Sequence, residues 1–274
     1  GGRHGLTIGR TEKPVITIVT GAANGIGRSV ARLAAERPHD GRPASLLLVD
    51  RDAPGVEAVA SELRATGARV EICIADMSDI ATPEIVVSAA DSTFGGVDVL
   101  VSNAGILHSV PIRDIGPAEI DAIFAINTRA ALLLGQAAHP FLKASRGAIV
   151  ATASIAATHP TVPLGAYSAS KAALVMFVRQ MALEWAGDGI RCNCVSPGPT
   201  NTSMTASAYA DAALRKRREM EIPLKRIGRP EDIAGAIHFL SGPDAAFITG
   251  VDLVVDGGLA LTTMVSSNSA AHAV

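Results

Sequence analysis

Two residues that can carry out proton chemistry, Tyr167 and Lys171, lie four positions apart in the stretch "GAYSASKAAL". On a helix, residues at this spacing share one face, so the lysine ammonium can lie near the phenol. A free tyrosine has a pKa of about 10, and a nearby cation favours the phenolate. A phenol tuned in this way can exchange a proton with a substrate hydroxyl or carbonyl. Taken alone, the pair fits a helical tyrosine beside a solvated lysine better than a catalytic pair.

A second motif, "VTGAANGIGRSV", is suited to binding phosphate. Gly21, Gly25 and Gly27 follow a predicted strand and open a predicted helix. Glycines let the backbone turn tightly and approach a pyrophosphate closely, and the helix N-terminus faces that group with the positive end of its dipole. The position at the start of a strand–helix–strand unit favours a dinucleotide site over a purely structural turn.

Acidic residues at two later strand ends could bind the adenosine half of a dinucleotide. Asp50 ends "LLLVD", in the window where a carboxylate binds the ribose hydroxyls. Its charge would repel a 2′-phosphate and so favours NAD over NADP. Arg51, together with Arg28, supports the opposite choice, although a solvated loop charge is the simpler interpretation of Arg51. Asp76 could meet the adenine amino group or could cap a helix.

Strand-like and helix-like segments alternate along the whole chain and must position these residues. Strands are predicted over 14–21, 44–50, 69–76, 97–105, 147–154, 190–198 and 252–258. Helices are predicted over 26–36, 55–67, 85–93, 118–142, 166–186 and 231–240. The short, continuously apolar strands indicate burial on both faces. The predicted fold class is therefore α/β: a single-domain Rossmann-type doubly wound parallel sheet of about seven strands with helices on both faces.

Composition excludes several other classes of protein. Apolar residues make up 48% of the 274 residues, charged residues 18%, and the net charge is −2. These values fit a large core and argue against nucleic-acid or membrane partners. The three cysteines suit a reducing compartment, so a cytoplasmic location is expected. Cys192 and Cys194 fit small core residues better than a metal or redox pair, and the histidines lack metal-ligand spacing, so no metal is expected.

The segments at the two ends are predicted to differ from the domain between them. Residues 1–13 are polar and lack a signal-peptide core, so we expect a flexible segment, either a cloning remnant or a processed end. The domain is expected over 14–261. Residues 262–274 are small and polar and are predicted to be a flexible tail.

Several motifs, in order and spacing, make the chain resemble a classical short-chain dehydrogenase/reductase from about Val15 to Gly258. They are "TGAANGIG", "SNAG" at 102–105, "IN" at 126–127, Ser154 thirteen positions before Tyr167, "VSPGPTNT" and "VDGG". Ser102 departs mildly from the family's usual asparagine. The resemblance implies Asn127, Ser154, Tyr167 and Lys171 as the catalytic residues.

Each of these four residues has a role implied by the resemblance. Tyr167 would be the general acid/base, and Ser154 would hydrogen-bond the reacting oxygen. Lys171 would bind the nicotinamide ribose and lower the tyrosine pKa, and Asn127 would hold a water that links the lysine to solvent. Val195 and Pro197 would flank the nicotinamide ring. The predicted cofactor-binding residues are Gly21, Asn24, Gly25, Ile26, Gly27, Asp50, Arg51, Asp76, Met77, Asn103, Ala104, Gly105, Tyr167, Lys171, Pro197, Gly198, Thr200 and Thr202.

The segment 200–228 resembles the family's substrate lid, and its small residues suit a segment that orders on binding. The predicted substrate-binding residues are Ser154, Ile155, Leu107, His159, Leu164 and Met204. Ile106, His108 and Val162 are expected near them. Because most of these side chains are apolar, a small, neutral, mainly apolar alcohol or ketone is predicted. The basic run 215–219 is interpreted as a solvated helix face.

The leading functional prediction is an NAD-dependent oxidoreductase that interconverts a secondary alcohol and a ketone by hydride transfer, with Tyr167 as acid/base. An NADPH-dependent ketoreductase of the same fold is one alternative, and a non-catalytic NAD-binding sensor or scaffold is another. Apolar residues on more than one face of the helices 118–142 and 166–186 call for a partner. The resemblance implies a helix bundle between subunits, so a homo-oligomer, tetramer or dimer, is expected.

Overall fold

A seven-stranded, all-parallel sheet in the order β3-β2-β1-β4-β5-β6-β7 forms the centre of this computed structural model, which describes residues 13–264. The strands are β1 (Val15–Thr20), β2 (Ala44–Asp50), β3 (Arg69–Ile74), β4 (Val99–Ser102), β5 (Ala148–Thr152), β6 (Arg191–Pro197) and β7 (Asp252–Val255). The chain steps from β1 outward to β3, then returns to the other side of β1 at β4. The predicted doubly wound fold is confirmed.

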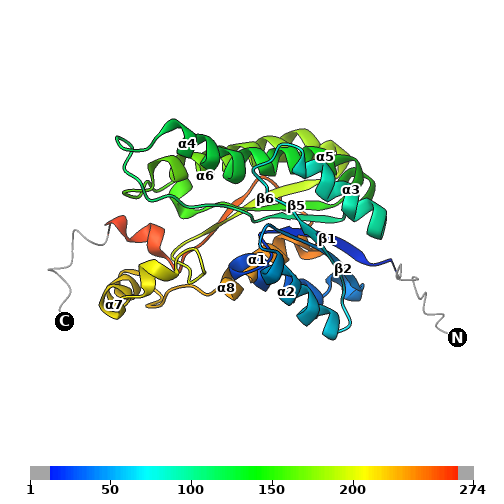
Figure 1. Cartoon of the computed structure of the whole chain (residues 1–274), viewed down its shortest axis with the longest axis horizontal. Helices are drawn as coiled ribbons and strands as arrows, with labels where there is room; N and C mark the ends of the chain where they lie inside the picture. The colour runs from blue at the N-terminus through cyan, green and yellow to red at the C-terminus, as the bar shows by residue number, and fades with distance from the viewer. Residues whose placement is uncertain (1–12, 265–274) are drawn as a thin grey trace, which may run out of the picture.

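Helices cover both faces of the sheet (Figure 1). They are α1 (Gly25–Glu36), α2 (Ala53–Ala65), α3 (Thr82–Phe94), α4 (Pro117–Phe124), α5 (Ala130–Ser145), α6 (Gly165–Trp185), α7 (Ala212–Glu221) and α8 (Pro230–Ser241). In Figure 1, α3, α4, α5 and α6 lie above the sheet, and α1, α2 and α8 lie below it. Each layer has its own apolar core, one that includes Leu100, Leu134 and Leu174 and one that includes Leu46, Leu48 and Ile237.

The expected burial on both faces holds for the five inner strands and fails at the two edges. Every residue of β1, β4 and β5 is buried. On β3, Arg69, Glu71 and Ile74 are exposed, and β7 is mostly half-buried. An edge strand has a neighbour on one side only, so its side chains are covered less completely.

The predicted helix 118–142 is interrupted by one π-helical turn. The α-helices α4 and α5 are joined by Ala125–Arg129, which adopts π-helical geometry. Asn127 sits in the middle of that turn and is buried. Such single π turns inside α-helices occur often at functional sites, because they redirect a side chain.

The predicted flexible ends, 1–13 and 262–274, fall almost wholly outside the described residues, although 262–264 belong to a 3₁₀-helix, Leu259–Met264.

Cys192 and Cys194 are buried core residues, and burial raises the pKa of the Cys192 thiol to about 12. Within 13–264, no cluster of three or more His, Cys, Asp or Glu side chains could hold a metal ion. Over the same range, no helix combines the length and hydropathy that crossing a bilayer requires.

A pair of stacked histidines joins the loop before β2 to α8. The rings of His39 and His238 lie 4.1 Å apart, centroid to centroid, at an angle of 15°. The pKa of His39 is lowered to about 4. Burial is the largest cause, and the neighbouring His238 and Arg191 also lower it. Asp40 and Asp244 act in the opposite direction.

We expect His39 to make the protein less stable in acid. The unfolded pKa is about 6.5, so this histidine has no effect above that pH, and stability is lost as the pH falls from about 6.5 towards 4. The loss is about 2 kcal/mol between pH 7 and pH 5. Urea unfolding at the two pH values should show this extra loss in the wild type and in His159→Gln, an exposed control, but not in His39→Gln. Equal losses in all three proteins would contradict the assignment.

Candidate active site

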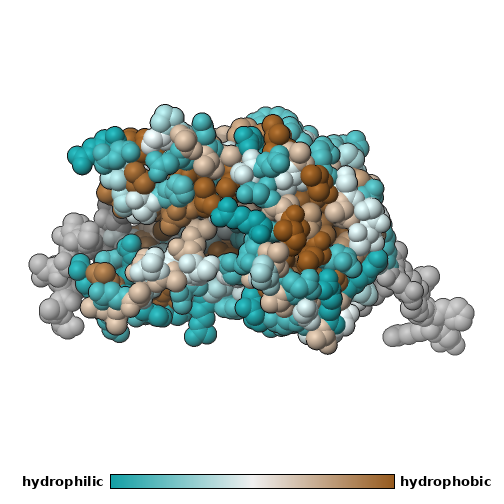
Figure 2. Space-filling view, viewed as in Figure 1, coloured by the Kyte–Doolittle hydropathy of each residue, from teal (hydrophilic) through white to brown (hydrophobic). Residues whose placement is uncertain are grey.

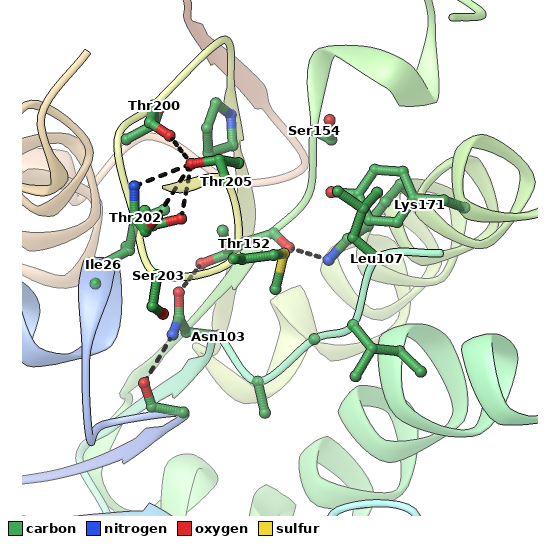
Figure 3. Close-up of a pocket in the computed structure, with 18 of the residues that line it drawn as sticks. Ile26, Asn103, Leu107, Thr152, Ser154, Lys171, Thr200, Thr202, Ser203 and Thr205 are labelled. Carbon is green, nitrogen blue, oxygen red and sulfur yellow. Dashed lines mark hydrogen bonds between the residues drawn. The ribbon is translucent and has the colours of Figure 1, made fainter. Parts of the chain in front are cut away.

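A cavity of about 640 Å³ lies beyond the carboxyl ends of the strands and extends under the segment 200–228, here called the lid. This is the edge where ligands bind in open parallel sheets, at the point where the strand order reverses. In the space-filling view the surface is hollowed between the upper helical layer and the lower left part, where α7 lies (Figure 2). Figure 3 shows Ser154 and Lys171 on one side of the cavity and Thr200, Thr202 and Thr205 of the lid on the other.

The glycine loop between β1 and α1 forms one end of the cavity. Gly21 and Gly25 both have positive φ angles, +67° and +53°, a conformation that glycine adopts without strain. A Cβ at Gly25 would lie 3.3 Å from the Thr202 Cβ. Asn24 precedes the helix, but its side chain accepts a hydrogen bond from the Ser203 hydroxyl at 2.6 Å instead of capping α1.

The glycine loop therefore fits a phosphate-bearing group. The first amides of α1 are left without a side-chain cap from Asn24, and the glycines leave bare backbone beside the cavity. An anion at a helix N-terminus is stabilised by such amides and by the helix dipole. Gly27 differs from the other two, because it does not line the cavity. A Cβ there would lie 2.0 Å from the carbonyl oxygen of Gly21, so Gly27 allows α1 to pack against the loop.

The charged side chains at the glycine-loop end of the cavity come from residues at or just after the carboxyl ends of β2 and β3. Asp50 accepts hydrogen bonds from the amides of Ala23, at 2.9 Å, and Asp52, at 3.0 Å. Arg51 is largely exposed, and its Nη1 lies 3.7 Å from the Asp76 carboxylate. Hydrogen bonds from Ser78 are the largest cause that lowers the pKa of Asp76. Asp76 thus forms a local turn rather than the N-cap of α3, which is Ala81.

Asn103 connects three strands rather than offering a free amide to a ligand. Its Nδ2 donates to the carbonyls of Thr20, at 3.1 Å, and Gly21, at 3.3 Å. Its Oδ1 accepts from the Thr152 hydroxyl at 3.0 Å. These bonds fix the glycine loop to β4 and β5, although Asn103 also lines the cavity.

Tyr167 and Lys171 both line the cavity from the first two turns of α6. The Lys171 Nζ is 5.8 Å from the centroid of the Tyr167 ring and donates to the Thr152 carbonyl at 2.7 Å. Burial lowers the pKa of Lys171 to about 8, so the ammonium form still dominates at neutral pH. Ser154 lines the cavity from the end of β5, and its Oγ accepts from the Ala156 amide at 3.1 Å.

The pKa of Tyr167 moves in the direction opposite to the sequence prediction. Burial raises it, and the only opposing contribution comes from the Ser154 hydroxyl. Lys171, whose ammonium donates to the Thr152 carbonyl and lies 5.8 Å from the ring centroid, does not offset this rise. In the chain by itself, desolvation therefore outweighs the effect of the cation, and the phenol is protonated at neutral pH.

Asn127 lies behind the cavity and does not line it. Its amide accepts from the Ile106 backbone N–H, at 2.8 Å, and donates to the Ile106 carbonyl, at 3.0 Å, and to the Ser170 hydroxyl, at 3.1 Å. Ser170 in turn donates to the Tyr167 carbonyl at 2.7 Å. The π turn thus connects the loop after β4 to the first turns of α6, which carry Tyr167 and Lys171.

The predicted cofactor residues other than Gly27 all line the cavity. Of the predicted substrate residues, Ser154, Ile155, Leu107, Leu164 and Met204 also line it, as do Ile106 and His108.

His159, Val162 and Val195 are not brought to this cavity. His159 and Val162 lie in an exposed turn, and Val195 is fully buried in β6. Three further lining residues carry no distinctive signal in the sequence: Tyr209, Arg218 and Leu259. Tyr209 is one of only two tyrosines, and this scarcity was the one available clue.

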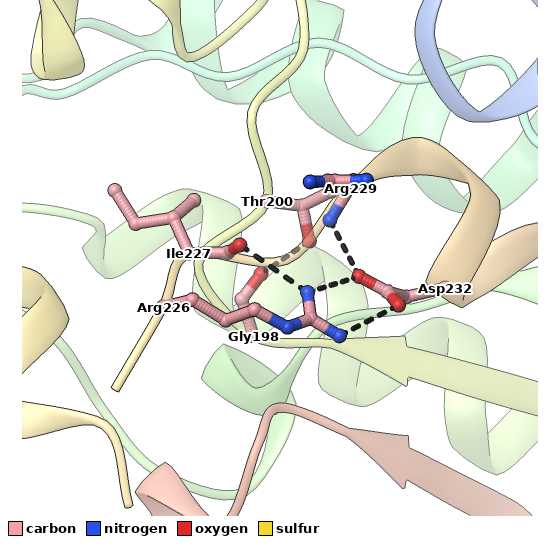
Figure 4. Close-up of polar contacts among 6 residues, drawn as sticks. All are labelled: Gly198, Thr200, Arg226, Ile227, Arg229 and Asp232. Carbon is pink, nitrogen blue, oxygen red and sulfur yellow. Dashed lines mark hydrogen bonds and ion pairs between the residues drawn. The ribbon is translucent and has the colours of Figure 1, made fainter. Parts of the chain in front are cut away.

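The two ends of the lid are held together beside the site (Figure 4). Thr200 and Gly228 form a parallel bridge, with backbone hydrogen bonds of 2.9 Å from Asn201 to Gly228 and from Gly228 to Pro199. Arg226 donates to both carboxylate oxygens of Asp232, at 2.6 and 2.8 Å. Asp232 also accepts from the Arg229 amide at 2.7 Å. We call the Thr200–Gly228 bridge with the Arg226–Asp232 pair the clasp.

Comparisons with known proteins agree with this fold. Residues 21–260 match the family model described as enoyl-(acyl carrier protein) reductase. The chain is 37% identical over 255 residues to 2,3-dihydro-2,3-dihydroxybenzoate dehydrogenase of Bacillus subtilis (strain 168), covering 90% of this chain and 96% of that protein.

Two crystal structures of Brucella melitensis proteins are also similar. One is a short-chain dehydrogenase/reductase, SDR:glucose/ribitol dehydrogenase, with a TM-score of 0.83, 34% identity and coverage of 89% of this chain and 96% of that one. The other is 3-ketoacyl-(acyl-carrier-protein) reductase complexed with NADH. It has a TM-score of 0.81, 33% identity and coverage of 91% of this chain and 100% of that one.

Proposed function

We propose, because the chain belongs to the classical short-chain dehydrogenase/reductase family, that it interconverts a secondary alcohol and a ketone with NAD as its cofactor. The chain is an oxidoreductase of CH–OH groups, like the dehydrogenases it resembles. One observation carries the finer proposal: Ser154, Tyr167 and Lys171 line the same cavity as the glycine loop.

The proposed chemistry divides between the cofactor and the side chains. When bound, the nicotinamide accepts or supplies the hydride at the substrate carbon. Tyr167 Oη donates its proton to the ketone oxygen during reduction, and burial keeps that phenol protonated beforehand. Ser154 Oγ donates a hydrogen bond to the same oxygen and stabilises its developing charge. Lys171, with its buried ammonium, holds positive charge beside the phenolate left by the transfer.

The proposed preference for NAD rests on the charges at the adenine end. Asp50 lines the cavity, and its carboxylate would repel a 2′-phosphate. Arg28, one of the two cations that could grip that phosphate, pairs with Glu62 at 2.9 Å and does not line the cavity. Arg51 lines it, but is largely exposed and lies near Asp76. The charges therefore favour NAD over the alternative, an NADPH-dependent ketoreductase.

Asp50→Asn is expected to weaken the preference for NAD. The wild type should show a kcat/KM for NAD at least about tenfold above that for NADP, because a like-charge contact of about 4 Å costs on the order of 4 kcal/mol before screening. In the variant the ratio should fall at least about fivefold, since each tenfold step corresponds to about 1.4 kcal/mol. Asp52→Asn removes the same charge two residues away and should leave the ratio unchanged. A wild type that prefers NADPH would exclude this use of Asp50.

A panel of secondary alcohols and ketones, followed at the NADH absorbance band, tests the reaction itself. Turnover of some members, in at least one direction, is expected. A chain that binds NADH in a fluorescence titration yet turns over no member of the panel would support the non-catalytic sensor or scaffold instead.

A homo-oligomeric assembly and a cytoplasmic location belong to the same proposal. Met176, Phe177 and Leu183 are exposed on α6, and an apolar helical face of this kind favours a subunit contact. We therefore propose a homo-oligomer, dimer or tetramer; sedimentation of the protein as a monomer at micromolar concentration would contradict it. The three cysteines are free, as expected in a reducing compartment such as the cytoplasm.

A further inference from the structure

The lid brings a cation to the cavity that its sequence context does not single out. Arg218 belongs to the basic run on α7, all of which the sequence assigns to a solvated helix face. Arg218 alone of that run lines the cavity, together with Tyr209 from the 3₁₀-helix Ala206–Tyr209. The Arg218 Nη1 lies 2.8 Å from Glu221, and the side chain remains 45% exposed.

Charge is distributed unevenly along the cavity. Among the described lining residues, the only carboxylates are those of Asp50 and Asp76, which follow β2 and β3 at the adenine end. Away from that end the cavity is lined by two cations, Lys171 and Arg218. Lys171 is committed to the Thr152 carbonyl. Arg218 is therefore the cation on the lid side of the cavity that can bind a substrate group.

The surroundings of Arg218 define the group that it would recognise. Tyr209 is half-buried; burial raises its pKa, and the nearby Arg218 guanidinium opposes that rise. Met204 and Leu259 add apolar side chains to this side, and the lid threonines add hydroxyls, but no carboxylate lines it among the described residues. A guanidinium matches the geometry of a carboxylate, which accepts two parallel hydrogen bonds from it, and the Tyr209 hydroxyl is a further candidate donor because that residue also lines the cavity.

We propose that the substrate of the proposed reaction carries a carboxylate, and that Arg218, with Tyr209 beside it, binds this group. The inference rests on the proposed function, and it replaces the neutral substrate expected from the sequence. The Arg218–Glu221 pair does not prevent it, because an exposed ion pair contributes little to stability and can be exchanged for a ligand carboxylate. The whole of α7 has the same sign of charge: Arg215, Lys216, Arg217 and Arg218 outnumber Glu219 and Glu221 by two.

Two ring alcohols that differ only at one substituent test the proposal. They are 4-hydroxycyclohexanecarboxylate and 4-methylcyclohexanol, each with NAD. The wild type should show at least about tenfold higher kcat/KM for the carboxylate. Arg218→Gln should reduce this ratio by about tenfold to a hundredfold, the range for a lost charge-assisted hydrogen bond. Arg217→Gln removes the same charge from the same helix, away from the cavity, and should leave the ratio unchanged.

The outcomes separate this inference from the proposed function. If the methyl alcohol is turned over as well as the carboxylate, or if both glutamine variants change the ratio equally, the carboxylate assignment is wrong while the oxidoreductase stands. If neither alcohol reacts, a thermal shift in the presence of NADH decides. Cyclohexanecarboxylate should raise the unfolding temperature of the wild type and of Arg217→Gln, but not that of Arg218→Gln. Equal shifts in all three proteins would overturn the proposal.

Discussion

Replacing Tyr167 with Phe is expected to lower kcat by about 10³-fold, with a range of 10²–10⁴ for the loss of a general acid/base. The ring remains, so the packing of α6 against the cavity changes little. Only the hydroxyl that exchanges the proton, and its interaction with Ser154, are removed. Steady-state rates with an alcohol from the panel, measured at saturating NAD, give the effect.

The chain supplies its own control for this experiment. Tyr209→Phe removes the only other phenol hydroxyl, which also lines the cavity, and should lower kcat by less than about tenfold. NADH binding, followed by fluorescence, should change by less than about threefold in Tyr167→Phe, because the glycine loop is untouched. Residual activity above about a tenth of the wild type in Tyr167→Phe would show that another group moves the proton.

Gly27→Ala is expected to damage both stability and dinucleotide binding, although Gly27 does not line the cavity. The new Cβ would lie 2.0 Å from the Gly21 carbonyl oxygen, so the loop or α1 must move. Forced overpacking of this kind costs about 1–3 kcal/mol. Because Gly21 lines the cavity, the displacement should also weaken NADH binding at least about tenfold.

Gly235→Ala is the matched control for that variant. Gly235 lies in α8, and a Cβ there would meet no atom within 4 Å. Alanine is the better helix former, so this change should leave stability equal or raise it by up to about 1 kcal/mol. Urea unfolding and NADH titration of the two variants, side by side, test the comparison. A Gly27→Ala protein that behaved like Gly235→Ala would show that the loop has room for the extra carbon.

Local patterns predicted the strands and helices of the framework, and they predicted that Tyr167 and Lys171 would lie together. The apolar runs and the glycine spacing predicted β1, α1 and the glycine loop between them, because these features depend on neighbours in the sequence. The four-residue spacing likewise brought Tyr167 and Lys171 to one helix face. In the chain by itself the pKa of Tyr167 is raised rather than lowered, because it depends on burial, which the local sequence pattern does not reveal.

The positions of His159 and Arg218 relative to the cavity differ from the prediction for a physical reason. His159 is nearby in sequence but lies in an exposed turn, whereas Arg218 is more than forty residues from Tyr167 and still lines the same cavity. A charged residue on an exposed helix has no periodicity that distinguishes the one position facing a cavity. Arg218 lines the cavity and Arg217 does not, and this difference arises only from the path of the lid in three dimensions.

The clasp has a consequence for how new specificities can arise in this chain. Because Thr200 and Gly228 are bridged, the residues between them form a loop whose two ends are held together at fixed points. Lengthening a loop whose ends are fixed costs little, about 0.6 kcal/mol for each doubling. Insertions or exchanges between those points, outside Thr202 and Ser203, which approach the glycine loop, can therefore alter which molecule is accepted without disturbing that loop.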